Sequence, residues 1–407
     1  MRKMIGGWSA QILDRVSWIL FALYAVDRLL KLLAVEHFFR HRPPAEPVPW
    51  PSVTLLQPIT RGVTNLAGAL AARRMLDYPG ELQHVLICDG DDGEILRVCR
   101  SFIATARRPG KLIVLEAPPG MIASKIAKLQ AGLDHASGAV LCFVDDDILL
   151  RPDALRRLVP FLFQPGTGAV FGLACYVSWH NLPTSLMSTF VNANALLTYV
   201  PLRYLVDPWT ITGHCYAVRH DDFWAAGGFD GMGRRVGDDH ELARRLRHIG
   251  LRSVQTPIIY DVENDMPTLN AYAAQIKRWS IFPREAMLPM LTSTEKAAAL
   301  GGSIGNLLPG LIALLALAGR RRSAQGALLA TLSIFAAGYA WCEARHLGRH
   351  TPLTRWPLLL ITALVTPFHA LVALNSGGAV VWRGRRLLVR RGGEVEVIGA
   401  RLEGPPR

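Results

Sequence analysis

The residues best suited to chemistry are three consecutive carboxylates, Asp145, Asp146 and Asp147, which directly follow the apolar run Val140–Val144. Such a run is typical of a strand buried on both faces, and open α/β sheets bind ligands beyond the carboxyl ends of such strands. Asp145 and Asp147 have the spacing of an Asp-x-Asp clamp for Mg²⁺ or Mn²⁺, an ion that can bridge phosphate oxygens and stabilise a departing diphosphate. The alternative, a run of capping acids before Pro152, explains the apolar strand less well.

A second acidic group, Asp89, Asp91 and Asp92, lies in the segment ICDGDDGE and also follows an apolar strand. If both strands belong to one parallel sheet, the two sets of acids face a shared crevice, where a nucleotide would bind. Taken alone, this group is more typical of a solvated turn, because turns are rich in Asp and Gly.

Asp238 and Asp239 form a third group, at the start of a charged helix predicted at 239–248. An acid in this position often only caps the helix or offsets its dipole. The functional alternative makes Asp239 a general base that removes a proton from an acceptor hydroxyl, which requires hydrogen-bond reach and a suitable pKa. His214, in TGHCYAV, is interpreted as structural.

Gln275, Arg278 and Trp279 form a fourth group, and their spacing places them on one face of a predicted helix. That face would offer a hydrogen bond, a fixed positive charge for phosphate and an aromatic wall. Alternatively, the Trp and the Arg mark the edge of a membrane. Lys125 is a further candidate for phosphate contact, although Lys125 and Lys128 also fit a solvated helix face.

Alternating strands and helices must position these groups. Between residues 53 and 163 the apolar pattern switches repeatedly between short strand-like runs and the 3.6-residue period of helices. This alternation predicts an α/β fold with a mostly parallel sheet and helices on both faces. The expected strands are 53–57, 84–88, 111–115, 140–144, 211–218 and 253–260, and the expected helices are 65–76, 94–106, 124–135, 153–163, 239–248 and 270–280. The apolar stretch 182–200 is expected to lie against lipid.

Half of the 407 residues are hydrophobic, and the mean hydropathy of +0.22 is high for a soluble enzyme. Residues 300–318, 327–341 and 356–374 each approach the roughly 20 residues that cross a bilayer. A shorter apolar core at 16–26, with no cleavage site after it, predicts an N-terminal anchor by span or interface. We expect a membrane anchor helix at 1–40, a Pro-rich linker at 41–51, an α/β catalytic domain at 52–290, C-terminal membrane helices at 291–376 and a basic tail at 377–407.

The formal net charge of +13 would suggest nucleic-acid binding in a soluble chain. Here the arginines cluster beside the apolar segments, at 320–322 and 383–391, where the positive-inside bias and anionic lipid account for them. No nucleic-acid-binding motif accompanies them. The six cysteines stand singly, which argues against zinc and disulfides and fits a reducing compartment. We expect a multi-pass cell-membrane protein whose catalytic domain faces the cytoplasm.

In this order the motifs resemble those of family 2-type (GT-A) glycosyltransferases, most closely the ceramide glucosyltransferase branch, over residues 53–289. Several ordered motifs are far more specific than any one of them. The matching segments are LLQPITRG, LDYPGELQHVLICDGDDG, SKIAKLQAGL, VDDDILLRPDAL, ITGHCYAVRHDDFWAAGGF, VGDDHELARRL and QIKRW. Ceramide glucosyltransferases often show a degenerate second motif, whereas this chain has all three acids, which favours a bound metal.

The resemblance implies a Rossmann-like GT-A fold and a role for each group. The first acidic motif contacts the uridine nucleotide, the second holds Mg²⁺ or Mn²⁺ and the diphosphate, the third supplies the catalytic base, and the (Q/R)xxRW motif lines the donor and acceptor sites. In this sequence the nucleotide contacts fall on Asp91, Asp92, Lys125 and Asp145, the metal ligands on Asp145 and Asp147, the base on Asp239, and the donor and acceptor site on Asp238, Gln275, Arg278 and Trp279.

These observations predict a membrane-bound inverting enzyme that moves a hexose from a UDP-sugar to a lipid hydroxyl, with glucose as the first candidate for the hexose. One alternative is transfer from UDP-GlcNAc or UDP-glucose to a hopanoid or another lipid, since a related branch glycosylates hopanoids. Another is a processive polysaccharide synthase. Such an enzyme needs a translocation channel, and three modest apolar segments look insufficient to form one. A non-catalytic membrane scaffold would not need four ordered motifs.

The predicted topology contains a conflict. If all three C-terminal apolar segments crossed the membrane, the arginine-rich tail would end outside the cell, against the positive-inside bias. We therefore expect one of these segments to be re-entrant or interfacial, with the tail in the cytoplasm.

Overall fold

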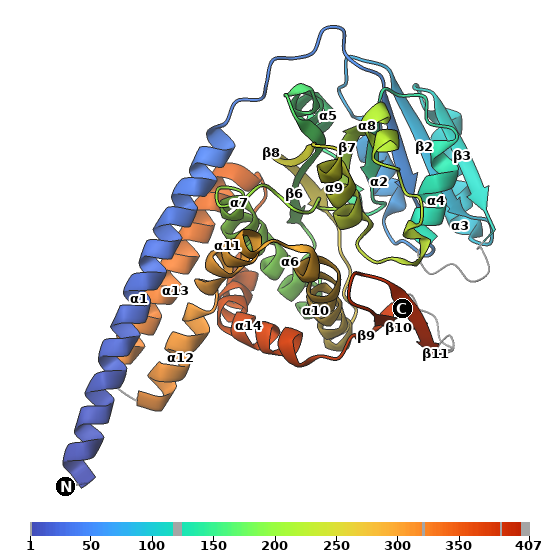
Figure 1. Ribbon diagram of the computed structural model, residues 1–407. Helices are drawn as coiled ribbons and strands as arrows, with labels where there is room; N and C mark the ends of the chain where they lie inside the picture. Colours follow the sequence, from blue (N-terminus) through green and yellow to red (C-terminus); the bar gives the residue numbers. More distant parts are fainter. Residues whose placement is uncertain (1, 117–123, 320–321, 383–384, 400–407) are drawn as a thin grey trace.

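A computed structural model describes residues 2–116, 124–319, 322–382 and 385–399 of the chain. Arg320, Arg321 and Arg383, which belong to the predicted basic clusters, lie outside the described residues. The α/β class is confirmed, because helices surround an eight-stranded sheet of order β3-β2-β1-β4-β7-β6-β8-β5 (Figure 1). Its strands are β1 (Val53–Pro58), β2 (Leu82–Asp89), β3 (Gly110–Leu115), β4 (Val140–Val144), β5 (Ile148–Leu149), β6 (Thr167–Tyr176), β7 (Cys215–Arg219) and β8 (Arg252–Val262).

We call this sheet, together with its helices, the sheet unit (residues 53–282). Its helices are α2 (Leu66–Arg74), α3 (Gly93–Thr105), α4 (Ser124–Leu133), α5 (Ala154–Leu158), α6 (Leu182–Asn194), α7 (Val200–Leu202), α8 (His220–Ala225), α9 (Asp238–His248) and α10 (Leu269–Phe282). The helix predicted at 153–163 is shorter than expected, because α5 passes into a 3₁₀ turn at Val159–Phe163 that contains Pro160. Strand β6, which the sequence analysis did not foresee, is buried along its whole length.

Strand β1 lies at the centre of the half of the sheet that carries the acidic motifs. It pairs in parallel with β2 on one side and with β4 on the other, while β4 pairs antiparallel with β7. Every residue of β1 and of β4 is buried, as expected for strands covered on both faces. Because parallel strands end at the same edge of a sheet, Asp89 and Asp145 are brought to one edge.

The remaining long helices lie beside the sheet unit (Figure 1). They are α1 (Arg2–Arg40), α11 (Ser293–Ile304), α12 (Leu308–Gly319), α13 (Arg322–Cys342, continued by the turn Glu343–Leu347) and α14 (Trp356–Asn375). Within the described part of the chain, two helical segments are long and apolar enough to cross a membrane, Arg322–Leu347 and Leu353–Val372. The pair α11 and α12, bent by 46°, makes a third if it counts as one span.

The segment expected to be a basic tail forms a three-stranded antiparallel sheet. Its strands are β9 (Ala379–Trp382), β10 (Arg385–Val389) and β11 (Val395–Gly399), in the order β11-β10-β9. Val380, Leu387 and Val389 share a small core with Val236 and Ile281 of the sheet unit. The C-terminal sheet is therefore packed beside α10 and the start of α9.

Candidate active site

The loop after β1 joins the first two acidic groups into one site. The amide N–H of Thr60 donates to Asp146 Oδ2, and that of Gly62 donates to Asp92 Oδ2 at 2.9 Å. Arg61 lies between them and forms an ion pair with Asp91 at 2.7 Å. Acids that follow β2 and β4 are thus held by one short backbone segment.

The members of the first group differ in how strongly they are engaged. Asp92 caps α3, because its Oδ1 accepts from the amide of Ile95 at 3.2 Å while its Oδ2 accepts from Gly62. Asp89 is buried and pairs with Lys128 at 2.7 Å. The Asp91 side chain is 62% exposed. Of the two candidate nucleotide contacts, Asp92 therefore shapes the loop and Asp91 presents its carboxylate at the surface.

Lys125 connects the second acidic group to the third. Its ammonium lies 2.6 Å from Asp145 Oδ1 and 4.0 Å from Asp238 Oδ2, and it donates to the carbonyl of Gly213 at 3.2 Å. Burial alone would lower the pKa of Lys125, but Asp145 and Asp238 outweigh it and raise that pKa. The solvated face proposed for Lys125 and Lys128 is wrong, because both lysines point at acids inside the protein.

Asp239 lies in the first turn of α9, next to Asp238. Gly237, at φ +76°, adopts a left-handed conformation that favours glycine and lets the chain turn sharply into the helix. Asp239 Oδ1 accepts from the amide of His240 at 2.8 Å. Its Oδ2 would lie only 2.9 Å from a Cβ placed on Gly213, so a side chain there would strike the carboxylate. Burial and the neighbouring Asp238 raise the pKa of Asp239 to about 7, which suits a general base at neutral pH.

A buried arginine that the sequence analysis missed lies beneath the acid triplet. Arg73 is 1% exposed and donates from Nη2 to the backbone carbonyl of Asp145 at 2.6 Å. Burial lowers its pKa to about 10, and the charges of the triplet oppose that shift. The signal was present in the sequence: Leu66, Ala69, Leu70 and Arg73 have helical spacing, and together they form the buried side of α2.

The positive charge of Arg278, on the motif helix α10, acts on the ring of His214. Thr268 caps α10 by accepting from the amide of Ala271, and Trp279 packs against the hydrophobic core of the sheet unit. Burial, followed by the positive charges of Lys125 and Arg278, lowers the pKa of His214 to about 4, so its ring is neutral at pH 7. The His214 carbonyl accepts from the amide of Asp145 at 2.9 Å. Gln275 is half-buried on the same helix.

Asp145 and Asp147 fit a divalent cation with few protein ligands. Within the described residues, no three His, Cys, Asp or Glu side chains form a ready metal cluster. However, Asp147 Oδ1 is buried without a hydrogen-bond partner among those residues, and burial raises the pKa of this carboxyl well above its ordinary value. Such an oxygen needs a cation or a proton. Because Mg²⁺ is usually held by one or two carboxylates plus substrate phosphates, this donor set suits it.

Comparisons with known proteins show the family of the chain. Residues 16–395 match the family described as Glycosyl transferase family 21. The beta-monoglucosyldiacylglycerol synthase of Synechocystis sp. is 26% identical over 159 residues, which are 38% of this chain and 33% of that relative. This chain thus spans about a third of the length of the curated relative that it matches.

A solved structure has the same fold. The mannosyltransferase PcManGT from Pyrobaculum calidifontis, in complex with GDP-Man and Mn²⁺, superposes over 89% of this chain and 97% of its own, with a TM-score of 0.53 at 18% identity. At that identity the likeness concerns the fold alone. The family match covers most of the chain, including all four motifs. The chain therefore belongs to glycosyl transferase family 21, the ceramide glucosyltransferase family of GT-A glycosyltransferases.

Proposed function

We propose that this protein transfers a hexose, glucose first, from a UDP-sugar to the hydroxyl of a membrane lipid with inversion at the anomeric carbon. The observation that carries the proposal is the junction at Lys125, which brings Asp145 of the second motif and Asp238 of the third within 4.0 Å of one ammonium. The family supports sugar transfer, and the Synechocystis relative, by its name a glycolipid synthase, supports a lipid acceptor.

The chemistry follows from the positions of the acids. In the proposed step the Asp239 carboxylate takes the proton of the acceptor hydroxyl while that oxygen bonds to the anomeric carbon. The bond from the anomeric carbon to the diphosphate breaks at the same time, and UDP leaves with the electron pair. A single displacement inverts the configuration. Gly213, which has no side chain, leaves room for the hydroxyl beside Asp239.

Other residues of the site bind and orient the donor. In this proposal Asp91 and Arg61, which are exposed, contact the nucleoside, and Arg278 and Trp279 supply a positive charge and an aromatic wall. Asp145 and Asp147 would hold Mg²⁺ or Mn²⁺, which when bound would offset the negative charge of the leaving diphosphate. Lys125 keeps Asp145 oriented toward the third motif.

Membrane attachment through α1 is part of the proposal. The outer side of α1 exposes apolar side chains from Ile12 to Leu33. The charged side chains of Asp27, Arg28 and Lys31 turn inward, being 20%, 4% and 6% exposed, and the two cations lie against Asp27. Between Val16 and Leu33 the face toward lipid is therefore apolar, although this part of the helix contains charges. We place the sheet unit on the cytoplasmic face of the cell membrane.

The decisive experiment compares Asp239→Asn with Asp221→Asn in vesicles that contain the full chain. Asp221 is fully exposed on α8, so its variant controls for the loss of one surface charge. Asp239→Asn should retain UDP binding and lose transfer of labelled glucose from UDP-glucose to lipid, while Asp221→Asn should retain both. Turnover by Asp239→Asn at the wild-type rate would remove Asp239 from the role of base. A long polymeric product would instead identify a processive synthase.

A further inference from the structure

Helix α14 is long and apolar enough to cross a membrane, yet both of its ends are tied to the sheet unit. Just before the helix, Arg349 pairs with Asp261 of β8 at 2.6 Å, and Arg355 donates to the carbonyl of Trp179 at 3.0 Å. Arg151 of the sheet unit pairs with Asp261 at 2.7 Å and also donates to the carbonyl of Leu347 at 2.7 Å. The start of α14 therefore lies on the side of the membrane that holds the sheet unit.

The far end of α14 returns to the same unit. The helix ends at Asn375 and β9 begins at Ala379, a stretch that can extend at most about 14 Å. The hydrocarbon core of a bilayer is about 30 Å thick, so these residues cannot cross it. Further along, the carbonyl of Gly393 accepts from the amide of Val236 at 2.9 Å, and the amide of Gly392 donates to the carbonyl of Glu285 at 2.8 Å.

A helix whose two ends meet one folded unit cannot have a bilayer between those ends. The sheet unit cannot straddle the membrane either, because its loops would leave backbone polar groups unsatisfied in hydrocarbon. We infer that α14 does not cross the membrane but lies within the leaflet next to the sheet unit. The inference rests on the membrane attachment proposed above. It identifies α14 as the C-terminal segment that does not cross, which the positive charge of the tail led us to expect.

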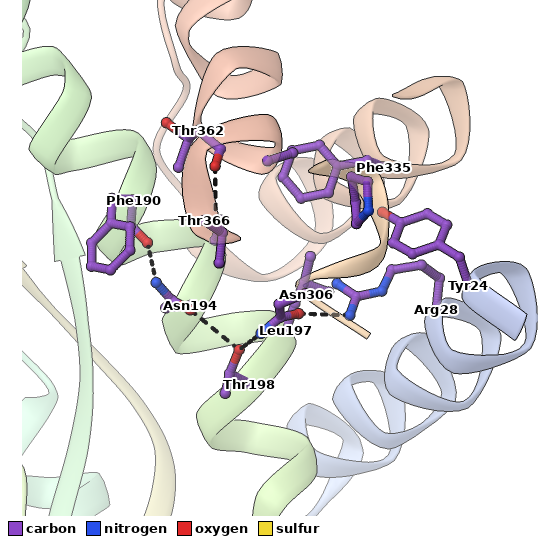
Figure 2. Close-up of a pocket in the computed structure, with 13 residues that line it drawn as sticks. Tyr24, Arg28, Phe190, Asn194, Leu197, Thr198, Asn306, Phe335, Thr362 and Thr366 are labelled. Carbon is purple, nitrogen blue, oxygen red and sulfur yellow. Dashed lines mark hydrogen bonds between the residues drawn. The ribbon is translucent and has the colours of Figure 1, made fainter. Parts of the chain in front are cut away.

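The two sides of α14 match this placement. Thr362 and Thr366 face inward to the pocket between α6 and α1, as Figure 2 shows, and Thr362 Oγ1 lies 2.9 Å from Thr189 Oγ1 of α6. Ile361, Phe368 and Val372 are spaced by seven and four residues on one stripe and are 45–54% exposed. The occupants of this stripe are the acyl chains of the adjoining leaflet, since α13 beside it is apolar enough to cross the same bilayer.

This placement brings lipid to the motif helix. His369 of α14 lies 3.3 Å from the hydroxyl of Tyr272 on α10, and its ring is 5.3 Å from that of Phe190 on α6. Tyr272 is one turn before Gln275, the first residue of the (Q/R)xxRW motif. Helices α6, α10 and α14 thus form a junction at which a lipid in the leaflet reaches the helix that carries the (Q/R)xxRW motif.

Depth measurements with nitroxide labels test the inference, using single cysteines in membranes that contain the full chain. The six native cysteines are buried and should remain unlabelled. Ile361→Cys and Val372→Cys are eleven residues apart, so in a crossing helix their depths would differ by about 16 Å. We expect similar depths for this pair. Leu329→Cys and Trp341→Cys on α13 provide the matched pair, for which we expect about 18 Å. If the two labels on α14 differed in depth as much as the two on α13, or if both were exposed to water, the inference would be overturned.

Labelling with a membrane-impermeant maleimide provides a second test that does not perturb α14. Glu396→Cys on the C-terminal sheet and Ser101→Cys on α3 should react from the same face of the vesicle, and Ser323→Cys at the start of α13 should react from the opposite face. Reaction of Glu396→Cys from the face of Ser323→Cys would show that α14 crosses. Release of the whole protein by alkaline carbonate would instead refute the membrane attachment itself.

Discussion

Adding one methyl group to the C-terminal sheet should impair catalysis, because the turn at Gly392 and Gly393 touches the loop that carries the proposed base. Gly393 accepts from the amide of Val236, three residues before Asp239. A Cβ on Gly393 would lie 3.0 Å from Ala286 Cβ and 3.3 Å from the carbonyl oxygen of Val236. Gly393→Ala therefore displaces the loop that leads from Val236 to Asp239, or the turn that follows α10.

Gly392→Ala is a matched control for this variant. Gly392 has φ +95° and Gly393 has φ +86°, so an alanine at either position costs about 1–2 kcal/mol for the left-handed conformation. A Cβ on Gly392 would meet only the flexible end of Met290, at 3.6 Å. Both variants should therefore lose similar stability, but only Gly393→Ala must move Val236 by a few tenths of an ångström.

Such a shift should be visible in turnover. A misplacement of 1 Å can cost roughly 100-fold in rate, so a few tenths should reduce kcat by about 3- to 10-fold for Gly393→Ala relative to Gly392→Ala. The assay measures transfer from UDP-glucose to lipid in vesicles with matched amounts of folded protein, together with UDP binding, which should not change. Equal kcat values for the two variants would refute the idea that the C-terminal sheet positions the base.

Three further predictions follow from the site. Because the pKa of Asp239 is raised to about 7 and a base must be deprotonated, kcat/KM should fall about tenfold per unit as pH drops below 7, as a pH–rate profile would show; a flat profile down to pH 5.5 would contradict it. Lys125 opposes the rise in the pKa of Asp239, so Lys125→Met should move this acid limb to higher pH and Lys125→Arg should leave it in place. Arg73→Met removes the cation that donates to the carbonyl of Asp145, and it should cost about 1.5–3 kcal/mol of stability, the usual value for a hydrogen bond to a charged group. Arg74→Met at the exposed neighbouring position should cost less than about 1 kcal/mol. Thermal unfolding of the purified protein would show whether the two differ.

The acidic motifs could be located from sequence because their signal is local. An apolar run that ends in carboxylates marks both a buried strand and its chemically active end, as at Val144 and Asp145. The contact of Lys125 with Asp145 and Asp238 has no such signal, because it joins α4, the end of β4 and the start of α9. The lysines were correctly placed on one face of a helix, but only the tertiary structure shows that this face meets acids rather than water.

The C-terminal sheet could not be foreseen for a related reason. Strand β10 contains Arg385 and Arg386, and Arg390 follows it directly, so the charges hide the alternation that usually reveals a strand. Each strand alone is marginal and becomes stable only when it packs on other elements. Val380, Leu387 and Val389 find that partner in Val236 and Ile281. The fold of the tail is thus decided by the surface of the sheet unit, which no local pattern encodes.

In the proposed topology, average hydropathy misjudges α1 and α14 in opposite directions, and both errors have the same physical cause. Average hydropathy makes α1 look too polar for a membrane helix, because it counts Asp27, Arg28 and Lys31. These side chains turn inward, and Lys31 donates to the carbonyl of Gly302 at 2.8 Å. The same average makes α14 look like a crossing helix, because it does not record that Arg349, before the helix, pairs with Asp261 of the sheet unit. What a lipid contacts is the outer face of a helix, and whether a helix crosses depends on what holds its ends. The labelling pairs on α13 and α14 therefore test the topology more directly than any measure of composition.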